Sequence, residues 1–448
     1  MSWLEAALSE TASSSAESLS TFEAHIDPAW IDEALEATGT ATLRRRRLPA
    51  EQVVWLVLGM ALMRDRPMDD VVAKLDLALP GTGTGKTVAS STVAQARKRL
   101  GPAPMRWLFE RCSQAWTRKS AEAHAWKGLA LYALDGTTLR VADSDENRAH
   151  FGFANGGRSD SGYPLVRMAA LIAARSHLIV AAAFGPYTNS EHHYAERLWS
   201  EIPPNSLTLV DRNFLSARIL LGLQNGTNRH WILRAKSNTS WTIVKKLGPD
   251  DLLVEMKVSD TARRQDQTLP ATFQARAIGY SIDKSKPKQW MLTSLLDPAA
   301  YTALEIIAGY HERWEIELTY DELKTHQLDR LETLRSRSVK GIEQEIWGVL
   351  LTYNLVRLEM ERIADEAGLP PSRISFVVAM RYIRDEWEWC AISSSPGSFP
   401  EKLRRMRAKI LNFVLPERRS ERRFPRAVKL KMSNYAKKRR APKPAPAK

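Results

Sequence analysis

Apolar residues in the first third of the chain recur every three to four positions, as in amphipathic helices. The stretch "PAEQVVWLVLGMAL" shows this pattern and has proline in what would be its first helical turn. The stretch "PAPMRWLFERCSQAW" repeats it. We therefore predict an all-helical N-terminal domain over residues 21–125. Residues 1–20 are rich in Ser, Ala and Glu, and we expect them to be flexible.

The pattern changes to short apolar strands after residue 126. The segment "GLALYALDGTTLRVAD" predicts two strands that meet near Asp135, and "LVRMAALIAARSHLIVAAAFG" predicts two more that turn at Ser176 and His177. A helical "SEHHYAERLWSEI", the strand "LTLVD" ending at Asp211 and a further helix follow. Strands interleaved with helices predict an α/β layer.

Strands return between about residues 229 and 300, which predicts a β-rich insertion within one α/β domain over residues 126–400. A charged helix, "YHERWEIELTYDELK" from Tyr310 to Lys324, and two apolar helices complete this domain. Residues 401–448 have too few apolar side chains to form a core, and we expect a basic, largely disordered tail there.

The net charge of +14 is concentrated in that tail. Residues 402–448 contain 18 Lys or Arg and two acids, so the rest of the chain has a net charge of −2. A basic end of this kind serves either as a solubilising extension or as an arm that binds a polyanion such as nucleic acid. The run Arg44–Arg47 allows the same two interpretations.

Several classes of protein are disfavoured. The longest apolar run, Val53–Met63, has 11 residues, whereas a membrane-spanning helix needs about 20. The N-terminus has no secretory pattern. The two cysteines form no CxxC pair and fit a reducing cytosol. The stretch "LPGTGTGKT" resembles a phosphate-binding loop, but Pro80 replaces its first glycine.

A short basic helix within "ASSTVAQARKRLG" carries Arg97, Lys98 and Arg99. Its length and its end at Gly101 suit a helix-turn-helix element that contacts DNA. A solvated charged helix face would have the same sequence, and both interpretations stay open.

Two aspartates follow apolar strands, where α/β sheets bind ligands. Asp135 follows "LALYAL" and Asp211 follows "SLTLV". Each also has a structural interpretation, because Asp-Gly is typical of turns and Asp of helix N-caps. Two or three carboxylates are enough to hold a hard divalent cation such as Mg²⁺. The charged helix offers a third.

One face of that helix brings Tyr310, Arg313, Glu317, Asp321 and Lys324 together, on a turn of roughly 100° per residue. The other acids, Glu312, Glu315 and Glu322, point away from this face. Helical geometry alone does not choose between Glu317 and Asp321, and a solvated salt-bridge face remains an alternative.

The spacing Tyr310-x2-Arg313-x3-Glu317-x6-Lys324 resembles the YREK signature of bacterial insertion-sequence DDE transposases, in the insertion sequence four family. "LDGTTLRVAD" and "LVDRNFLS" resemble the segments around that family's two aspartates, and "RRRRLPAEQVVWLVLGMALMRD" resembles its N-terminal domain. The resemblance covers residues 20–360 and selects Glu317 over Asp321.

The resemblance implies an RNase H-like core in which Asp135, Asp211 and Glu317 are catalytic and bind Mg²⁺, with Mn²⁺ as the alternative ion. It implies that Tyr310, Arg313 and Lys324 position DNA phosphates. Trp290 would receive a flipped base, although core packing is a competing role.

The implied function is cut-and-paste transposition: binding of terminal inverted repeats, metal-dependent cleavage, and transfer of the ends to target DNA. We expect a homodimer in the synaptic complex, no membrane partner, and action at the nucleoid in the bacterial cytoplasm. The alternatives are an RNase H-like nuclease without strand transfer and a DNA-binding regulator with an inactive catalytic fold.

Overall fold

The computed structural model describes residues 26–41, 48–74, 90–154, 162–281, 288–328, 333–392 and 399–416. The chain divides into a compact unit that ends at Val414 and a second unit, Leu415–Lys448. The predictions for residues 1–20, for Arg44–Arg47, for the glycine-rich stretch around Pro80 and for the tail beyond residue 416 lie outside the described residues. None of the described helices is long and apolar enough to cross a membrane.

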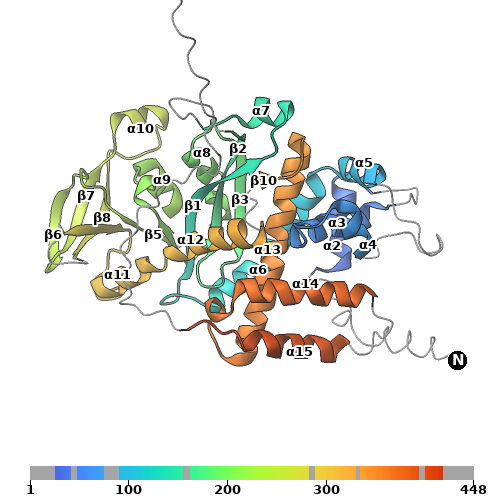
Figure 1. Ribbon diagram of the computed structural model, residues 1–448. Helices are drawn as coiled ribbons and strands as arrows, with labels where there is room; N and C mark the ends of the chain where they lie inside the picture. The colour runs from blue at the N-terminus through green and yellow to red at the C-terminus, as the bar shows by residue number, and fades with distance from the viewer. Residues whose placement is uncertain are drawn as a thin grey trace, which may run out of the picture. The chain divides into compact units, whose positions relative to one another are not determined.

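A mixed sheet forms the centre of the compact unit, in the strand order β3-β2-β1-β4-β5-β9-β8-β7-β6 (Figure 1). Strands β2 and β3 run antiparallel in a meander with β1, and β4 and β5 run parallel to β1. This is the RNase H-like arrangement, and the predicted α/β class is confirmed. The core strands are β1 (Ala130–Val141), β2 (Leu165–Ala173), β3 (Ile179–Pro186), β4 (Ser206–Val210) and β5 (Arg229–Arg234).

Strand β1 is continuous, so the prediction of two strands meeting near Asp135 was wrong. Asp135 and Gly136 pair with Ala170 and Ala169 of β2 without a break. Gly136 therefore does not form an Asp-Gly turn.

The β-rich insertion extends the same sheet and begins after β5, which belongs to the core. Strand β9 pairs with β5, and the insertion's other strands continue outward from it. The strand β6 was not expected from the sequence. The elements of the insertion are β6 (Thr242–Gly248), β7 (Asp251–Lys257), α10 (Asp260–Gln265), β8 (Thr272–Tyr280) and β9 (Gln289–Thr293).

Helices cover both faces of the core sheet. Alternate residues of β1 point to opposite faces, and each set packs against its own group of helices. Leu131 and Ala133 belong to the apolar cluster that contains the N-terminal helices and α13 (Val339–Ala367). Tyr132 and Leu134 belong to the cluster that contains α8 (Glu191–Glu196), η2 (Trp199–Glu201) and α9 (Ala217–Gln224). Helix α7 (Asp145–Phe151) lies between β1 and β2 in the sequence.

The described residues before β1 are helical, as predicted. Helix α13 packs on α3, α6 and β10 and so joins these helices to the sheet. The N-terminal helices are α2 (Pro28–Ala37), α3 (Ala50–Leu62), α4 (Met68–Lys74), α5 (Ser90–Leu100) and α6 (Ala103–Ala123).

The stretch predicted as one helix from Tyr310 to Lys324 has three parts. Helix α11 (Ala303–His311) passes through a tight turn into α12 (Trp314–Asp321), and the chain then widens into a π-helix, η4 (Glu322–Gln327). In the turn, the N–H of Arg313 bonds to the carbonyl of Tyr310, three residues back. In η4, the N–H of Leu328 bonds to the carbonyl of Leu323, five residues back.

The prediction of a disordered tail from residue 401 is wrong for residues 401–411, which are helical. Helix α15 (Phe399–Leu411) buries Leu403, Met406 and Ile410 in the main apolar cluster and packs on α14 (Phe376–Ile392). The remaining elements are β10 (Thr333–Leu334), which pairs with β1, and the short helices η3 (Arg212–Phe214) and η5 (Pro371–Arg373).

Candidate active site

Asp135 and Asp211 lie on neighbouring parallel strands. In the register of β1 with β4, Leu134 lies opposite Val210, the last residue of β4. In each chain segment the aspartate comes next, so Asp135 and Asp211 lie beside each other where β4 ends. Asp211 also caps η3 by accepting a hydrogen bond from the N–H of Asn213 at 3.4 Å. Asp211 therefore caps η3 and also lies beside Asp135.

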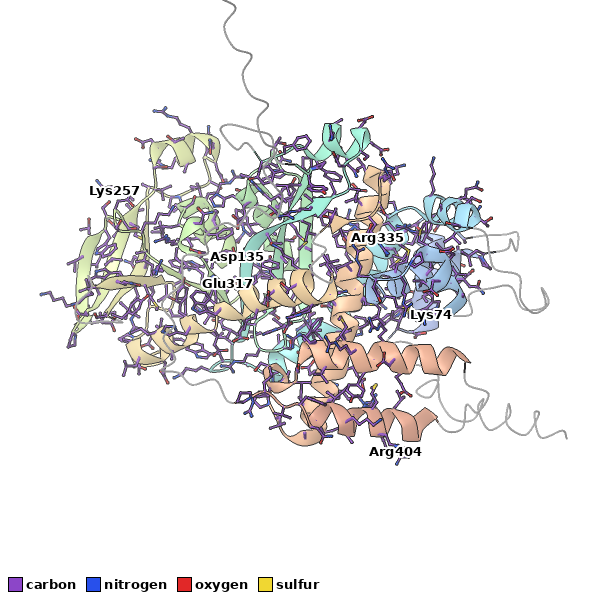
Figure 2. The ribbon with its side chains drawn as sticks, viewed as in Figure 1. Lys74, Asp135, Lys257, Glu317, Arg335 and Arg404 are labelled. Carbon is purple, nitrogen blue, oxygen red and sulfur yellow. The ribbon has the colours of Figure 1, made fainter. Side chains whose placement is uncertain are left out.

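Helix α12 packs on β1 and brings Glu317 close to Asp135. Figure 2 shows Asp135 and Glu317 next to each other where α12 crosses the sheet. The link between them is the guanidinium of Arg313. Its Nη2 donates a 2.9 Å hydrogen bond to Oε1 of Glu317, and its Nη1 lies 3.8 Å from Oδ2 of Asp135.

Arg313 is buried, and within the described part of the chain its Nη1 has no hydrogen-bond partner. Burial disfavours the charged form, but the hydrogen bond to Glu317 and the charges of Tyr310, Glu317 and Asp211 together outweigh burial and raise the pKa of Arg313. The site therefore has a permanent cation with one donor atom that makes no hydrogen bond and has only the longer contact to Asp135. Such a donor suits an oxygen of a bound phosphate.

The Asp135 carboxyl has a pKa raised to about 7. Burial is the main cause, and the charges of Glu191 and Asp211 add to it. A 2.8 Å hydrogen bond from the N–H of Gly136 and the charge of Arg313 act in the opposite direction. Negative charge is thus crowded at Asp135, which favours binding of a cation.

Two tyrosines hold the backbone at the aspartates. Tyr310 donates a 3.3 Å hydrogen bond to the carbonyl of Val210, and Tyr320 donates a 2.7 Å bond to the carbonyl of Asp135. Burial raises the pKa of Tyr310 to about 12, so its hydroxyl remains a donor at neutral pH. Lys324, in η4, donates to Oγ1 of Thr137 at 3.3 Å. Of the four residues of the YREK spacing, Tyr310 contacts the end of β4, Arg313 and Lys324 contact the middle of β1, and Glu317 contacts Arg313.

The other acids of the stretch have separate partners. Glu312 forms two 2.7 Å hydrogen bonds with Arg175, and Glu315 lies 2.7 Å from Nε2 of His177. Asp321 accepts a 2.6 Å bond from Thr325, and its side chain is 56% exposed. The structure therefore separates Asp321 from the aspartates and brings Glu317 to them.

Glu322 was expected to point away from the Glu317 face, and it is half-buried in a separate polar network. Its carboxylate pairs with Arg357, accepts a 2.7 Å hydrogen bond from Tyr353 and lies 3.4 Å from Nδ1 of His177. Sequence reasoning missed this network and Tyr320, because their partners are distant in the sequence. The sequence offered one signal for the role of Tyr320, namely an aromatic residue within a charged helix.

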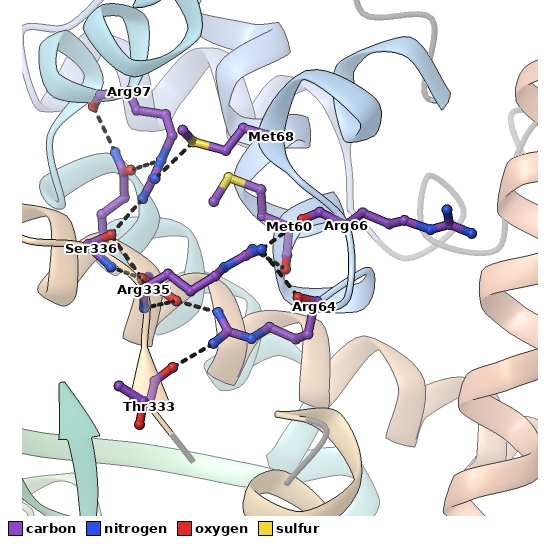
Figure 3. Close-up of polar contacts among 10 residues, drawn as sticks. Met60, Arg64, Arg66, Met68, Arg97, Thr333, Arg335 and Ser336 are labelled. Atoms are coloured by element: carbon purple, nitrogen blue, oxygen red, sulfur yellow. Dashed lines mark hydrogen bonds and ion pairs between the residues drawn. The ribbon is translucent and has the colours of Figure 1, made fainter. Parts of the chain in front are cut away.

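The predicted DNA-binding residues Arg97, Lys98 and Arg99 lie on α5 and point in different directions. Lys98 and Arg99 are exposed. Arg97 is directed into the protein, where it donates to Gln344 at 3.0 Å and to Ser336 at 3.2 Å (Figure 3). Burial lowers the pKa of Arg97. The structure thus places Arg97 in a contact between the N-terminal helices and the catalytic core.

Figure 3 shows the centre of that contact. Glu345 on α13 is buried and pairs with Arg64 from the end of α3, and it accepts hydrogen bonds from the N–H of Arg335 at 3.0 Å and from Ser336 at 2.8 Å. Arg335 in turn donates to the carbonyl of Arg66 at 2.7 Å.

Trp290 lies in β9 and is partly buried against the apolar cluster on the α9 side of the sheet. Its ring lies edge-on to that of Trp241, with the centroids 5.6 Å apart. This packing agrees with the alternative role predicted for Trp290, which is packing in the core. The structure does not bring Trp290 into contact with the carboxylates.

Comparison with known proteins identifies the family. Residues 16–110 match the insertion element 4 transposase N-terminal model, and residues 126–355 match the transposase DDE domain. The chain is 39% identical over 422 residues to transposase InsG for insertion sequence element IS4 of Escherichia coli (strain K12), which covers 92% of each protein. The chain belongs to the IS4 family of DDE transposases.

A second relative of this IS4-family transposase is the putative transposase InsZ of Escherichia coli (strain K12). It is 38% identical over 226 residues, covering 50% of this chain and 74% of InsZ. Among solved structures, the cryo-EM structure of the piggyBac transposase synaptic complex with hairpin DNA aligns with a TM-score of 0.46. That alignment has 12% sequence identity and covers 89% of this chain and 85% of the other.

A DDE transposase acts on DNA and depends on divalent metal ions. The carboxylates of this chain provide the oxygen donors that hard divalent cations prefer. Within the described residues, no three His, Cys, Asp or Glu side chains converge closely enough to hold an ion, because Arg313 lies between Asp135 and Glu317. The carboxylates of the site fit a divalent metal ion. In this structure the positive charge of the Arg313 guanidinium balances them instead.

Proposed function

We propose that this transposase carries out cut-and-paste movement of an insertion sequence, with Asp135, Asp211 and Glu317 as its catalytic carboxylates. The observation that supports this most strongly is that Arg313 bonds to Glu317 and lies 3.8 Å from Asp135, while Asp211 follows the strand β4 that pairs with β1. Together the three acids would hold Mg²⁺, or Mn²⁺ in its place. The bound ion would activate the attacking water or 3′-hydroxyl and stabilise the phosphodiester leaving oxygen.

Arg313 and Lys324 bind the DNA backbone in this proposal. Arg313 would turn its unpartnered Nη1 toward a phosphate oxygen at the scissile bond, and Lys324 would approach from the adjacent η4. Tyr310 keeps the end of β4 in place through its bond to Val210. Glu317 is 38% exposed, so DNA and metal reach it without unfolding of α12.

The DNA partners in this proposal are the terminal inverted repeats of the element and a target duplex. A homodimer would pair the two ends in a synaptic complex, and the bacterial nucleoid would be the place of action. Light scattering of the protein bound to a single end and to paired ends tests the dimer, because pairing requires two protomers for two ends.

The test of the catalytic assignment compares Glu317→Gln with Asp321→Asn on the same helix. On DNA that carries a transposon end, and with Mg²⁺ present, E317Q should cleave about three orders of magnitude more slowly than wild type. It should still bind the end, since the substitution removes only the negative charge of one metal-binding carboxylate. D321N should cleave like wild type. Cleavage by E317Q, or its loss in D321N, would contradict the assignment.

Strand transfer separates transposition from simple nuclease activity. With pre-cut ends and a target plasmid, a transposase joins 3′-hydroxyl ends to the target, whereas an RNase H-like nuclease only hydrolyses. An inactive regulator would show neither metal-dependent nicking nor joining.

A further inference from the structure

The turn between β2 and β3, residues 174–178, contacts the helical segment that carries Glu317. Arg175 lies in this turn, and its Nε and Nη2 each donate a 2.7 Å hydrogen bond to the carboxylate of Glu312. Its Nη1 donates to the carbonyls of His124 and Ala125 at 3.1 and 3.0 Å. All three nitrogens of the guanidinium are therefore engaged, and its position against Glu312 is fixed by the backbone behind it.

Glu312 lies at the point where α11 ends and the chain turns into α12. The next residue is Arg313, whose guanidinium bonds to Glu317 at 2.9 Å and lies 3.8 Å from Asp135. The contact between Arg175 and Glu312 therefore holds the turn from which Arg313 reaches the active site.

His177, in the same turn, is buried and contacts the next parts of the segment. Its Nε2 lies 2.7 Å from Oε2 of Glu315 in α12. Its Nδ1 lies 3.4 Å from Oε2 of Glu322 in η4 and contacts the guanidinium of Arg357 in α13. Side chains two positions apart on a helix point about 200° apart, so Glu315 and Glu317 lie on opposite sides of α12. The imidazole thus holds α12 from the side away from Glu317.

The backbone of His177 is in the left-handed region, with φ at 64°. This conformation is uncommon for residues other than glycine, and it persists where the surrounding contacts hold it. The N–H of His177 closes the turn with a 2.8 Å hydrogen bond to the carbonyl of Ala173. Glycine would adopt this turn more readily, but it has no ring to reach Glu315. The residue at this left-handed position is thus the one that supplies the contact to α12.

We propose that Arg175 and His177 are positioning residues for the transposase reaction. They hold the far side of the catalytic segment, so that Arg313 and Glu317 stay in place against Asp135. They act through this segment and touch neither DNA nor metal ion. This inference rests on the proposed roles of Arg313 and Glu317 at the scissile phosphate and the metal.

Single-turnover cleavage of a transposon end by saturating full-length protein separates a positioning role from a merely structural one. A variant that is only less stable has fewer folded molecules, and those molecules cleave with the wild-type rate constant. Arg175→Ala and His177→Asn should each lower the rate constant by about tenfold and leave the Kd for the end unchanged. Asparagine tolerates the left-handed backbone, so H177N removes the ring contact without straining the turn. A wild-type rate constant in either variant would overturn the role of that residue.

Arg218→Ala is the matched control for R175A. Arg218 pairs with Glu196 at 2.9 Å, with side chains 41% and 26% exposed, against 34% and 28% for Arg175 and Glu312. This pair joins α9 to α8, on the other face of the sheet from the apolar side of α12. R218A should cleave with the wild-type rate constant. An equal loss in R218A would show that losing any such pair slows cleavage and would overturn the inference.

A double-mutant cycle tests whether Arg175 acts through Glu312. Glu312→Ala should lower the rate constant as R175A does, and the double variant should be no slower than either single variant. Losses that multiply in the double variant would mean that Arg175 acts independently of Glu312 and would overturn its positioning role.

Glu317→Gln, measured beside these variants, distinguishes failure of this inference from failure of the proposed function. If E317Q cleaves with the wild-type rate constant, the catalytic assignment is wrong and the positioning role fails with it. If E317Q is inactive while R175A and H177N cleave like wild type, the assignment stands and only this inference fails.

Discussion

Tyr320 donates a 2.7 Å hydrogen bond to the backbone carbonyl of Asp135. Tyr310, on the preceding helix, makes the corresponding bond at 3.3 Å to Val210, next to Asp211. The helical segment that carries Glu317 is thus fixed at two points to the strands that carry the aspartates. The relative position of all three carboxylates depends on these two bonds.

Tyr320→Phe should slow DNA cleavage without weakening DNA binding. Loss of one hydrogen bond to a buried carbonyl costs about 1–3 kcal/mol, and part of this loss would appear as misplacement of Asp135. We expect roughly a tenfold lower single-turnover cleavage rate, with an unchanged Kd for the end. Tyr301→Phe is the control, since the Tyr301 ring stacks on Trp126, away from the carboxylates. A weaker Kd with a normal rate would argue against a positioning role.

Arg313→Ala should strengthen metal binding while it abolishes cleavage. The guanidinium lies 2.9 Å from Glu317 and 3.8 Å from Asp135 and repels an incoming cation. Its removal should raise Mn²⁺ affinity by about tenfold or more in the absence of DNA, on a Coulomb energy of a few kcal/mol for partly screened charges. Arg118→Ala, at an exposed pair on α6, should change neither property. A lower Mn²⁺ affinity in R313A would contradict the claim that the guanidinium repels an incoming cation.

Particular residues show how far the sequence could be interpreted. Asp135 and Asp211 were visible because each follows an apolar run that became β1 or β4. Helical periodicity could not separate Glu317 from Asp321, because an angle around a helix does not reveal which side faces the sheet. The YREK spacing selected Glu317, and the contact through Arg313 agrees with that choice.

Contacts between distant residues account for what the sequence did not reveal. Gly136 has the local signature of a turn, but Glu191, 55 positions later in the sequence, explains the missing side chain. Arg97 looks like its exposed neighbours Lys98 and Arg99, yet it binds Gln344 from α13. Local composition carries no information on such partners.

Substitutions on α5 should therefore have two different effects. Lys98→Ala and Arg99→Ala should each weaken DNA binding and lower the slope of log K against log salt by about one, if each contacts a phosphate. Arg97→Ala should lower thermal stability because Gln344 and Ser336 lose their partner. Titrations at several salt concentrations, together with thermal melts, distinguish these outcomes. An unchanged salt slope for K98A and R99A would remove α5 from the DNA interface.

Glu345→Gln should destabilise the contact between the N-terminal helices and the core. Glu345 is buried and pairs with the buried Arg64, so the substitution leaves a charge without its counter-ion. Breaking a pair of this kind costs about 3–5 kcal/mol of unfolding free energy. Glu343→Gln, two residues earlier on α13, is the control. Urea unfolding measures the stability of both variants. If E345Q were as stable as E343Q, Arg64 would have found another counter-ion.

Glu322 should make stability depend on pH in the acid range. Burial alone would raise its pKa, but the charges of Arg357 and His177 and the bond from Tyr353 outweigh burial and lower the pKa from 4.5 to about 2. A carboxyl whose pKa is lower in the folded state stabilises the fold above the unfolded pKa. This stabilisation is lost as pH falls from about 4.5 toward 2.

The stability difference between wild type and Glu322→Gln should thus be largest near neutral pH and narrow by on the order of 3 kcal/mol across that acid window. Urea unfolding of both proteins at a series of pH values measures this difference directly. Glu110→Gln, at an exposed pair with Arg106, should show no such change with pH. A constant difference between wild type and E322Q would mean that Glu322 is protonated in the fold. Arg357 would then be balanced by another group.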